Sequence, residues 1–320
     1  MSKKKLAKIL NNFKDKKIGI VGDVMLDRFI WGDVDRVSQE APIPIVRFEK
    51  EVFIPGGAGN VAANIASLSG VPFLVGAVGR DTEGGQLLKA LRTRNVNTRG
   101  VTSDRGRYTV QKTRIMARGQ HMIRLDKENI EYLTPTQEKR LISFIAENMS
   151  DWDGVVISDY AKGVASGTVI RETIRLAKKH QKFIVGDTKL KDVAFFKGVT
   201  VLKPNDKEAY LITGTNDVIE AGKRIEKKLQ CAVLITQGAK GMVLFKKNKA
   251  RHFPVKAREV YDATGAGDTV IAALALALVA GASLEEAVHV ANHAAGIVVG
   301  KVGVSTVSFD DLRKSLENDL

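Results

Sequence analysis

Short apolar runs alternate with longer stretches of helical periodicity along most of the chain, and no other feature of the sequence restricts its fold as strongly. Parallel strands must be joined by a crossover, which is usually a helix, so this alternation predicts a mainly parallel sheet flanked by helices, an α/β fold class. The predicted strands are 18–21, 73–78, 155–157, 183–185, 199–202 and 232–236. The predicted helices are 60–68, 83–93, 135–149, 166–180, 207–213, 218–229, 267–279 and 284–299.

Two segments depart from this alternation, residues 28–54 and 107–126. Each shows strand-like alternation of side chains without an intervening helix. They predict either one small antiparallel sheet that projects from the main domain as a lid, or an ordinary edge extension of the main sheet. Because no repeat and no Pro- or Ser-rich linker divides the chain, we expect a single domain over residues 1–320 that contains both segments.

Composition narrows the class of protein. With 44% hydrophobic residues the chain can form a large core, which excludes disorder. The net charge of +14 fits an anionic partner such as nucleic acid, a membrane or a phosphorylated small molecule. The one cysteine, Cys231, excludes an intrachain disulfide and favours a reducing cytoplasm. The first ten residues predict a solvated helix and not a secretory signal, and the longest apolar run, 271–280, is about half of a membrane-spanning helix.

The strongest motif runs from Asp262 to Thr269 and leads directly into an apolar helix. Its small residues allow a tight turn, so the amides of Gly265, Ala266 and Gly267 can form an anion hole for a phosphoryl group. Asp268 would then lie where it can take the proton of an attacking hydroxyl. A favourable charge at a helix start also explains Asp268, but not the small residues before it.

A second loop of small residues leads into the helix at 60–68. The loop contains Gly56 and Gly57, and Asn60 begins the helix. Together with Asp23 and Asp27, which follow the first strand, it suits a polyhydroxylated ligand. For the two aspartates, capping of a turn is the alternative. The spacing of the glycines also matches a dinucleotide-binding pattern, which keeps an NAD-dependent oxidoreductase as an alternative function.

Three further groups of residues invite a functional interpretation. Asn205 and Glu208 can hold a hydrated magnesium ion or form a capping box at a helix start. The turn containing Thr236, Gly238 and Gly241 can border nucleotide phosphates. His289 and His293 lie four residues apart on a late helix, where packing or surface placement is the favoured interpretation.

Taken together, these motifs resemble those of the ribokinase-like (PfkB) carbohydrate kinase family, from about residue 17 to residue 308. The resemblance implies a ribokinase-like fold with a small β-sheet lid, ATP and Mg2+ as cofactors, and a monovalent cation such as K+ as an open requirement. It implies that Asp268 is the catalytic base, that residues 265–267 form the anion hole and that magnesium is held by Asn205 and Glu208 through water. Thr236, Gly238 and Gly241 would border ATP, and Asn292 would lie near the adenine.

Within the family, segments 22–28, 38–44, 123–126 and 158–163 look most like the kinases of D-glycero-D-manno-heptose 7-phosphate. That resemblance implies phosphorylation of the anomeric hydroxyl to the 1,7-bisphosphate, in lipopolysaccharide biosynthesis. Lys162 and Lys189 are the leading candidates for binding the sugar phosphate. Thr188 departs from the pattern, since relatives tend to have proline there.

The alternatives are another sugar or sugar-phosphate kinase, such as a fructose-phosphate or ribose kinase, and a basic nucleic-acid-binding protein. The last is disfavoured because the basic residues are scattered without interleaved aromatic side chains. We therefore expect a sugar phosphate and ATP as partners, and neither nucleic acid nor a membrane. Apolar side chains on both faces of the lid favour a homodimer formed through it. The chain could be a stand-alone kinase or one half of a bifunctional enzyme.

Overall fold

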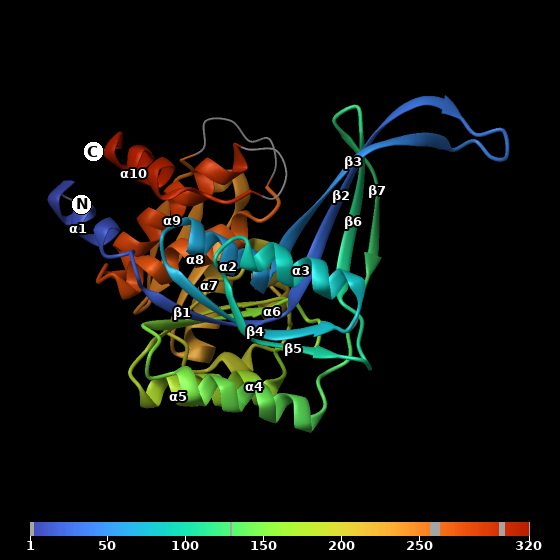
Figure 1. Ribbon diagram of the computed structural model, residues 1–320. Coiled ribbons are helices and arrows are strands. Elements are labelled where there is room, and N and C mark those ends of the chain that lie inside the picture. The colour runs from blue at the N-terminus through green and yellow to red at the C-terminus, as the bar shows by residue number, and fades with distance from the viewer. Residues whose placement is uncertain (1–2, 129, 257–262, 301–304, 320) are drawn as a thin grey trace.

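The computed structural model describes residues 3–128, 130–256, 263–300 and 305–319. Within these residues the main sheet has nine strands in the order β13-β12-β11-β10-β9-β8-β1-β4-β5, parallel from β11 to β5 (Figure 1). Its strands are β1 (Lys17–Gly22), β4 (Val71–Gly79), β5 (Asn97–Asp104), β8 (Gly154–Asp159), β9 (Phe183–Thr188), β10 (Val201–Leu202), β11 (Ala232–Thr236), β12 (Met242–Lys246) and β13 (Lys249–Phe253). The α/β fold class and the predicted strands are confirmed. β5, β12 and β13 are additional to the predicted strands. β5 and β13 are the edge strands of the sheet and lack the continuous apolar run of a buried strand.

Helices cover both faces of this sheet. Apolar side chains of α1 (Lys3–Asn11), α2 (Ala58–Ser67), α3 (Thr82–Arg92), α8 (Ala266–Val279), α9 (Leu284–Val299) and α10 (Phe309–Glu317) form one core with it. Those of α4 (Pro135–Asn148), α5 (Gly167–Lys179), α6 (Asp206–Thr213) and α7 (Val218–Leu229) form the core on the other face. The predicted helices are confirmed. No helix among the described residues is long and apolar enough to cross a bilayer.

The first helix corrects one expectation. We predicted a solvated helix over the first ten residues, but Leu6, Ile9 and Leu10 are only 2–3% exposed and belong to the core. They recur at spacings of three and one, so they share one face of α1, and the lysines occupy the rest of it. The basic composition hid this narrow apolar face.

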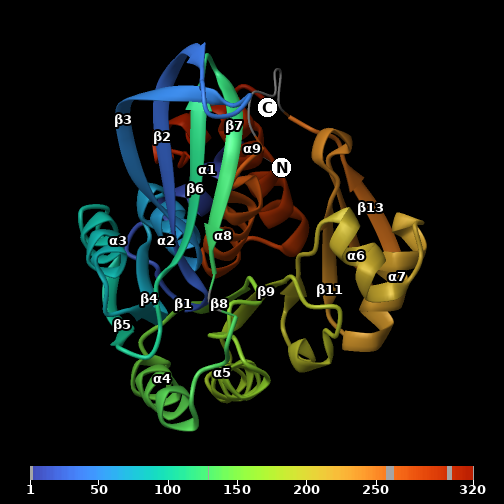
Figure 2. The ribbon, with the colours of Figure 1, turned by 90° about the vertical axis from the view of Figure 1, so that its right-hand side faces the viewer.

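The two predicted inserts form a separate sheet, which we call the projecting sheet. Its strands are β2 (Val24–Val37), β3 (Pro44–Gly57), β6 (Val110–Ala117) and β7 (Gln120–Lys127), in the order β3-β2-β6-β7. In Figure 2 it rises above β1 and β8, opposite α4 and α5. It is therefore not an edge extension of the main sheet.

We expected an antiparallel sheet, but the projecting sheet is mixed. β2 pairs with β3 and β6 with β7 in antiparallel fashion, but β2 and β6 are parallel. The reason is that β2 continues from β1 and β6 follows β5, and both of these parallel strands end at the same edge of the main sheet. Both inserts therefore leave that edge in the same direction.

Close backbone packing holds the junction between the two sheets. A side chain on Gly22, the last residue of β1, would overlap the carbonyl oxygen of Ser158 in β8. Gly57, which precedes α2, has φ +56° and lies against the backbone of Asp23. Only glycine allows these strand ends and the start of α2 to approach so closely.

We predict that Gly22→Ala lowers the free energy of unfolding by about 1–3 kcal/mol, because the added methyl group must displace the backbone of β8. Gly85→Ala is the matched control. Gly85 lies inside α3 with open space around its Cα, so alanine should raise stability by up to about 1 kcal/mol. Urea denaturation measures both. Equal midpoints for Gly22→Ala and the wild type would contradict the packing argument.

Candidate active site

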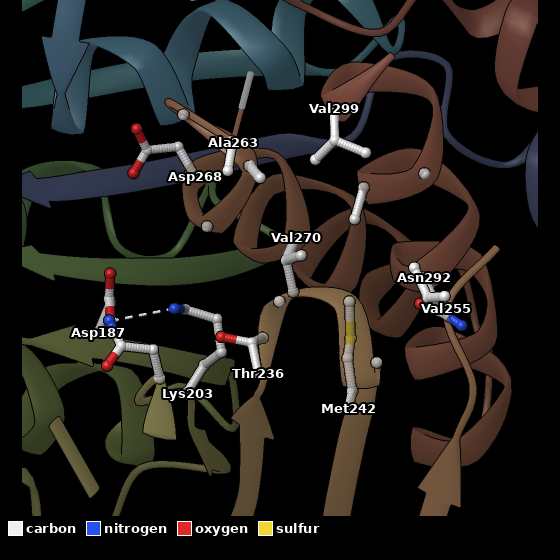
Figure 3. Close-up of a pocket in the computed structure, with 18 of the residues that line it drawn as sticks. Asp187, Lys203, Thr236, Met242, Val255, Ala263, Asp268, Val270, Asn292 and Val299 are labelled. Atoms are coloured by element: carbon white, nitrogen blue, oxygen red, sulfur yellow. Dashed lines mark ion pairs between the residues drawn. The ribbon is translucent and has the colours of Figure 1, made fainter. Parts of the chain in front are cut away.

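A cavity of about 460 Å³ opens where β9, β10 and β11 end and α8 begins (Figure 3). This edge, at the carboxyl ends of parallel strands, is where ligands bind in open α/β sheets. Most of the predicted catalytic and nucleotide-binding residues line it, namely Asn205, Thr236, Gly238, Gly241, Gly265, Ala266, Gly267, Asp268 and Asn292, together with Lys189. Asp262, the first residue of the motif, lies outside the described residues.

The first turn of α8 has the character predicted for an anion hole. Gly265 adopts φ +81° at the N-cap and offers no side chain to bond the following amides. The first residues of α8 line the cavity, so the positive end of the helix dipole lies there, and the rest of the helix is buried and apolar through most of its length. This terminus can bind a phosphoryl group through backbone N–H groups.

Asp268 lies in that first turn and is only 4% exposed. The Tyr160 hydroxyl donates to its Oδ1 at 2.6 Å, and the Asn60 side chain donates to its Oδ2 at 2.7 Å. Burial raises the pKa of Asp268 to about 6, although both hydrogen bonds lower it. A carboxylate with this pKa is ionised at neutral pH and can accept a proton.

Two neighbours orient the amide of Asn60. The Asn64 side chain donates to the Asn60 carbonyl oxygen at 3.0 Å and to its Oδ1 at 3.2 Å. Thr269 in turn donates to Asn64 Oδ1 at 3.0 Å. Asn60 was predicted as a sugar-binding residue, and its contact with Asp268 places it beside the candidate base.

Asp23 accepts three backbone hydrogen bonds from the loop after β8. Its carboxylate binds the amides of Tyr160, Lys162 and Val164 at 2.8, 3.0 and 2.9 Å. Asp23 therefore caps backbone amides, as the alternative interpretation predicts. The amides belong to the loop after β8 and not to the turn that contains Asp23. Because this loop carries Tyr160, Asp23 also determines where Tyr160 meets Asp268. Sugar binding by Asp23 stays a prediction.

Asp27 forms a buried ion pair with Arg114 across the projecting sheet. The Arg114 guanidinium also lies 5.1 Å from the ring centroid of Phe29. Gly56 leaves room for this pair, since a Cβ there would overlap the Asp27 carboxylate. The predicted substrate-binding residues Asp27, Gly56 and Gly57 thus lie together at the base of the projecting sheet, and their contact with substrate stays a prediction.

Two lysines converge on one acidic side chain near this base. Lys162 Nζ lies 2.9 Å from Glu128 Oε2, and Lys112 Nζ lies 3.6 Å from Glu128 Oε1. The hydrogen bond from Lys162 lowers the pKa of Glu128. Lys112 is also paired in register with Asp27, so the lysines lie between the sheet and the loop after β8. The position occupied by the Glu128 carboxylate therefore favours an anion, although Asp126, which also pairs with Lys112, opposes it.

Asn205 and Glu208 form the capping box that we had weighed against a magnesium site. Asn205 Oδ1 accepts from the Glu208 amide, and Glu208 Oε2 accepts from the Asn205 amide, both at 2.8 Å. Glu208 also pairs with Lys189, so Lys189 lies on the cavity side and not beside Glu128. The capping alternative is confirmed, and the magnesium role stays a prediction.

The sequence analysis missed Lys203 and Asp187. Lys203 is 2% exposed, and its Nζ lies 3.3 Å from Asp187 Oδ1 (Figure 3). Burial raises the pKa of Asp187, which the lysine opposes. A Cβ on Gly267 would lie 3.5 Å from Lys203 Nζ, so this ammonium adds a full positive charge beside the anion hole. The sequence feature that could have indicated Lys203 is its position directly after a buried strand.

The far end of the cavity is apolar. Met242, Val255, Val270 and Val299 line it, and they surround space suited to a flat heteroaromatic ring (Figure 3). Asn292 donates to the carbonyl oxygen of Pro254 at 2.7 Å and marks the polar edge of this space. The cavity therefore has an end at α8 lined by charged side chains, two lysines among them, and an apolar end at α9, as a nucleotide requires.

The family follows from comparison of the sequence. The model of the pfkB family of carbohydrate kinases matches residues 15–311, and the chain belongs to this family. The chain is therefore an ATP-dependent carbohydrate kinase by family, and the family supports neither the oxidoreductase nor the nucleic-acid-binding alternative.

Curated relatives named bifunctional protein HldE are similar over nearly the whole chain. The protein from Helicobacter acinonychis is 39% identical over 303 residues, 93% of this chain and 65% of the relative. The protein from Geobacter sulfurreducens is 38% identical over 93% of this chain and 62% of the relative. That from Caulobacter vibrioides is 42% identical over 96% and 65%. The chain thus spans 62–65% of the length of these relatives.

Solved structures show the same fold at lower identity. Ribokinase from Arabidopsis thaliana, complexed with ribose and ATP, has a TM-score of 0.73 and 21% identity over 95% of this chain and 99% of its own. The tetrameric inhibited form of phosphofructokinase-2 from Escherichia coli has a TM-score of 0.78 and 22% identity over 95% and 99%. The predicted ribokinase-like architecture is confirmed.

We predict that Tyr160→Phe moves the acidic limb of the profile of kcat/KM against pH to higher pH. In the wild type the limb should lie near pH 6, because activity is lost as Asp268 becomes protonated. The Tyr160 hydroxyl stabilises the ionised carboxylate, so its removal raises the pKa of Asp268.

Asp268→Asn is the companion variant. It should lower kcat by roughly two to four powers of ten, because an amide cannot take the proton, while the fold and nucleotide binding persist. Steady-state kinetics from pH 5 to 9 measure both variants. An unshifted limb in Tyr160→Phe, or near-normal turnover by folded Asp268→Asn, would contradict the assignment of Asp268 as the base.

Proposed function

We propose that this kinase transfers the γ-phosphoryl group of ATP to the anomeric hydroxyl of D-glycero-D-manno-heptose 7-phosphate, in lipopolysaccharide biosynthesis. The observation that carries the proposal is the buried Asp268 carboxylate, which lines the cavity and is bonded by Tyr160, on the same loop as Lys162. Identities of 38–42% with HldE proteins support the same substrate class. Ribose and fructose-phosphate kinases remain the alternatives.

The reaction follows from the charges around Asp268. The adenine lies in the apolar end near Asn292, and the phosphates pass Thr236, Gly238 and Gly241 toward the first turn of α8. Amides of residues 265–267 and the Lys203 ammonium stabilise the transferring phosphoryl group. Asp268 takes the proton of the sugar hydroxyl as the O–P bond forms, and ADP leaves.

Magnesium and potassium belong to the same proposal. Mg2+, when bound, neutralises charge on the ATP phosphates. Asn205 lines the cavity and Glu208 lies next to Asn205, so together they offer amide and carboxylate oxygens that fit hydrated Mg2+, and Lys189 must then leave Glu208. K+ is a candidate activator, because phosphofructokinase-2 from Escherichia coli has been solved in complex with potassium. Dependence on ATP also supports a cytoplasmic location.

Glu128 marks where the sugar phosphate binds. Its carboxylate is the anion between Lys162 and Lys112, and a phosphate dianion in the same place would bond both lysines more strongly. Lys162 can turn toward such a ligand without moving its backbone, since Asp23 holds its amide. Lys189, which lies on the cavity side, is the weaker candidate.

We predict that heptose 7-phosphate is used with a higher kcat/KM than unphosphorylated heptose, and that Lys162→Met removes most of this preference. Loss of one charge-assisted hydrogen bond of about 1.5–3 kcal/mol corresponds to roughly 10- to 150-fold. Lys179→Met, on the exposed face of α5, is the control and should behave as the wild type. ADP release measures each rate.

Two outcomes would contradict parts of this assignment. Equal efficiency on phosphorylated and unphosphorylated heptose would exclude a phosphate anchor. A preference for fructose 6-phosphate would keep the sugar kinase and exclude heptose as its substrate.

The projecting sheet also supports the proposal of a homodimer. Ile123 and Leu125 of β7 share one face with Ile115 of β6 and are 59% and 66% exposed. Phe48 of β3 is 61% exposed. Val110 and Met116 of β6 are already buried and need no partner. A second copy of the projecting sheet would cover the exposed apolar residues symmetrically and complete the lid.

We predict a dimer in sedimentation at micromolar concentration, and a monomer for Phe48→Asp, because a carboxylate cannot be buried unpaired in that interface. Leu211→Asp is the control, since Leu211 is 52% exposed on α6, away from the projecting sheet. A monomeric wild type, or a dimer that persists in Phe48→Asp, would contradict dimerisation through the projecting sheet.

A further inference from the structure

Three side chains converge where the end of α10 meets α9, apart from the residues assigned to catalysis. His289 and His293 lie one turn apart on α9, and Asp319 follows α10. His293 Nε2 lies 3.1 Å and His289 Nε2 lies 3.7 Å from the same oxygen, Asp319 Oδ2. All the potential ligand atoms lie within 4.8 Å of one another.

We propose that His289, His293 and Asp319 bind a divalent transition metal of the zinc type. Imidazole nitrogen and carboxylate oxygen are ordinary zinc ligands, with bonds of about 2.0–2.2 Å. In a tetrahedral site such bonds place ligand atoms about 3.4 Å apart. The two separations from Asp319 lie on either side of this value, and all three ligand atoms lie within 4.8 Å of one another, so rotation of the side chains would bring the two histidine nitrogens to the metal.

The surroundings of the three ligands suit a metal site. Ser315 Oγ lies 2.9 Å from His293 Nδ1, so this hydroxyl can accept a hydrogen bond from the Nδ1–H group and leave Nε2 unprotonated to bind the metal. Lys256 Nζ lies 2.6 Å from Asp319 Oδ1, the oxygen that does not face the histidines. Ser315 and Lys256 therefore orient two of the ligands, His293 and Asp319, from outside the metal site.

The three ligands differ in burial, as a metal site that is open to solvent on one side requires. His293 is 3% exposed and fixed, whereas the side chains of His289 and Asp319 are 26% and 29% exposed. Solvent can therefore supply the fourth ligand from the outer side. The metal would fasten the end of α10 to α9, the helix whose Asn292 lines the nucleotide cavity.

Titration with Co2+ tests the proposal in the full chain, dialysed against a chelator and free of ATP and Mg2+. We expect one Co2+ per chain with the visible absorption of a four-coordinate ion, displaced by Zn2+. His289→Gln and Asp319→Asn should each weaken binding by roughly tenfold or more. His180→Gln at the end of α5 is the control and should bind as the wild type.

Circular dichroism confirms that each variant is folded, and both test positions are partly exposed, so their replacement leaves the core intact. Zn2+ should also raise the melting temperature of the wild type and not that of His289→Gln. Absence of saturable Co2+ binding by the wild type would overturn the proposal. Equal binding by the wild type, His289→Gln and Asp319→Asn would also overturn it, because the metal would then lie elsewhere.

Discussion

Burial of the Asp268 carboxylate at the first turn of α8 is the constraint on which the surrounding elements depend. A buried carboxylate must be hydrogen-bonded, and here the donors come from α2 and from the loop after β8. Asp23, at the end of β1, holds that loop through three amides. Four separate parts of the chain are therefore needed to support one ionisable group with a pKa of about 6.

At this edge of the main sheet, four lysines lie in two separate pairs. Lys203 and Lys189 lie on the cavity side, where they face the proposed nucleotide phosphates. Lys162 and Lys112 lie toward the projecting sheet, where Glu128 now neutralises them. In the proposed reaction, donor and acceptor phosphates are therefore neutralised by different side chains. The separation follows from which strands end on either side of α8.

Much of this arrangement could be predicted from the sequence. The alternation of strands and helices, the two inserts, and the small-residue loop before Asp268 depend on local periodicity and on glycine, which act over a few residues. By contrast, the parallel pairing of β2 and β6 depends on where two distant strands end. The contact of Glu208 with Lys189 was also decided by tertiary structure, because Lys189 follows β9 and Glu208 lies in α6.

By itself the sequence determined the α/β class, the family resemblance and the residue at which a base could lie, because each depends on short-range pattern. Only the tertiary structure decided the partners of the charged groups. Asp27 meets Arg114 across 87 positions, Tyr160 meets Asp268 across 108, and Lys203 meets Asp187 at the end of the adjacent strand. Such pairs form because burial requires every charge to find a partner, and which partner is within reach depends on strand order and not on sequence neighbours.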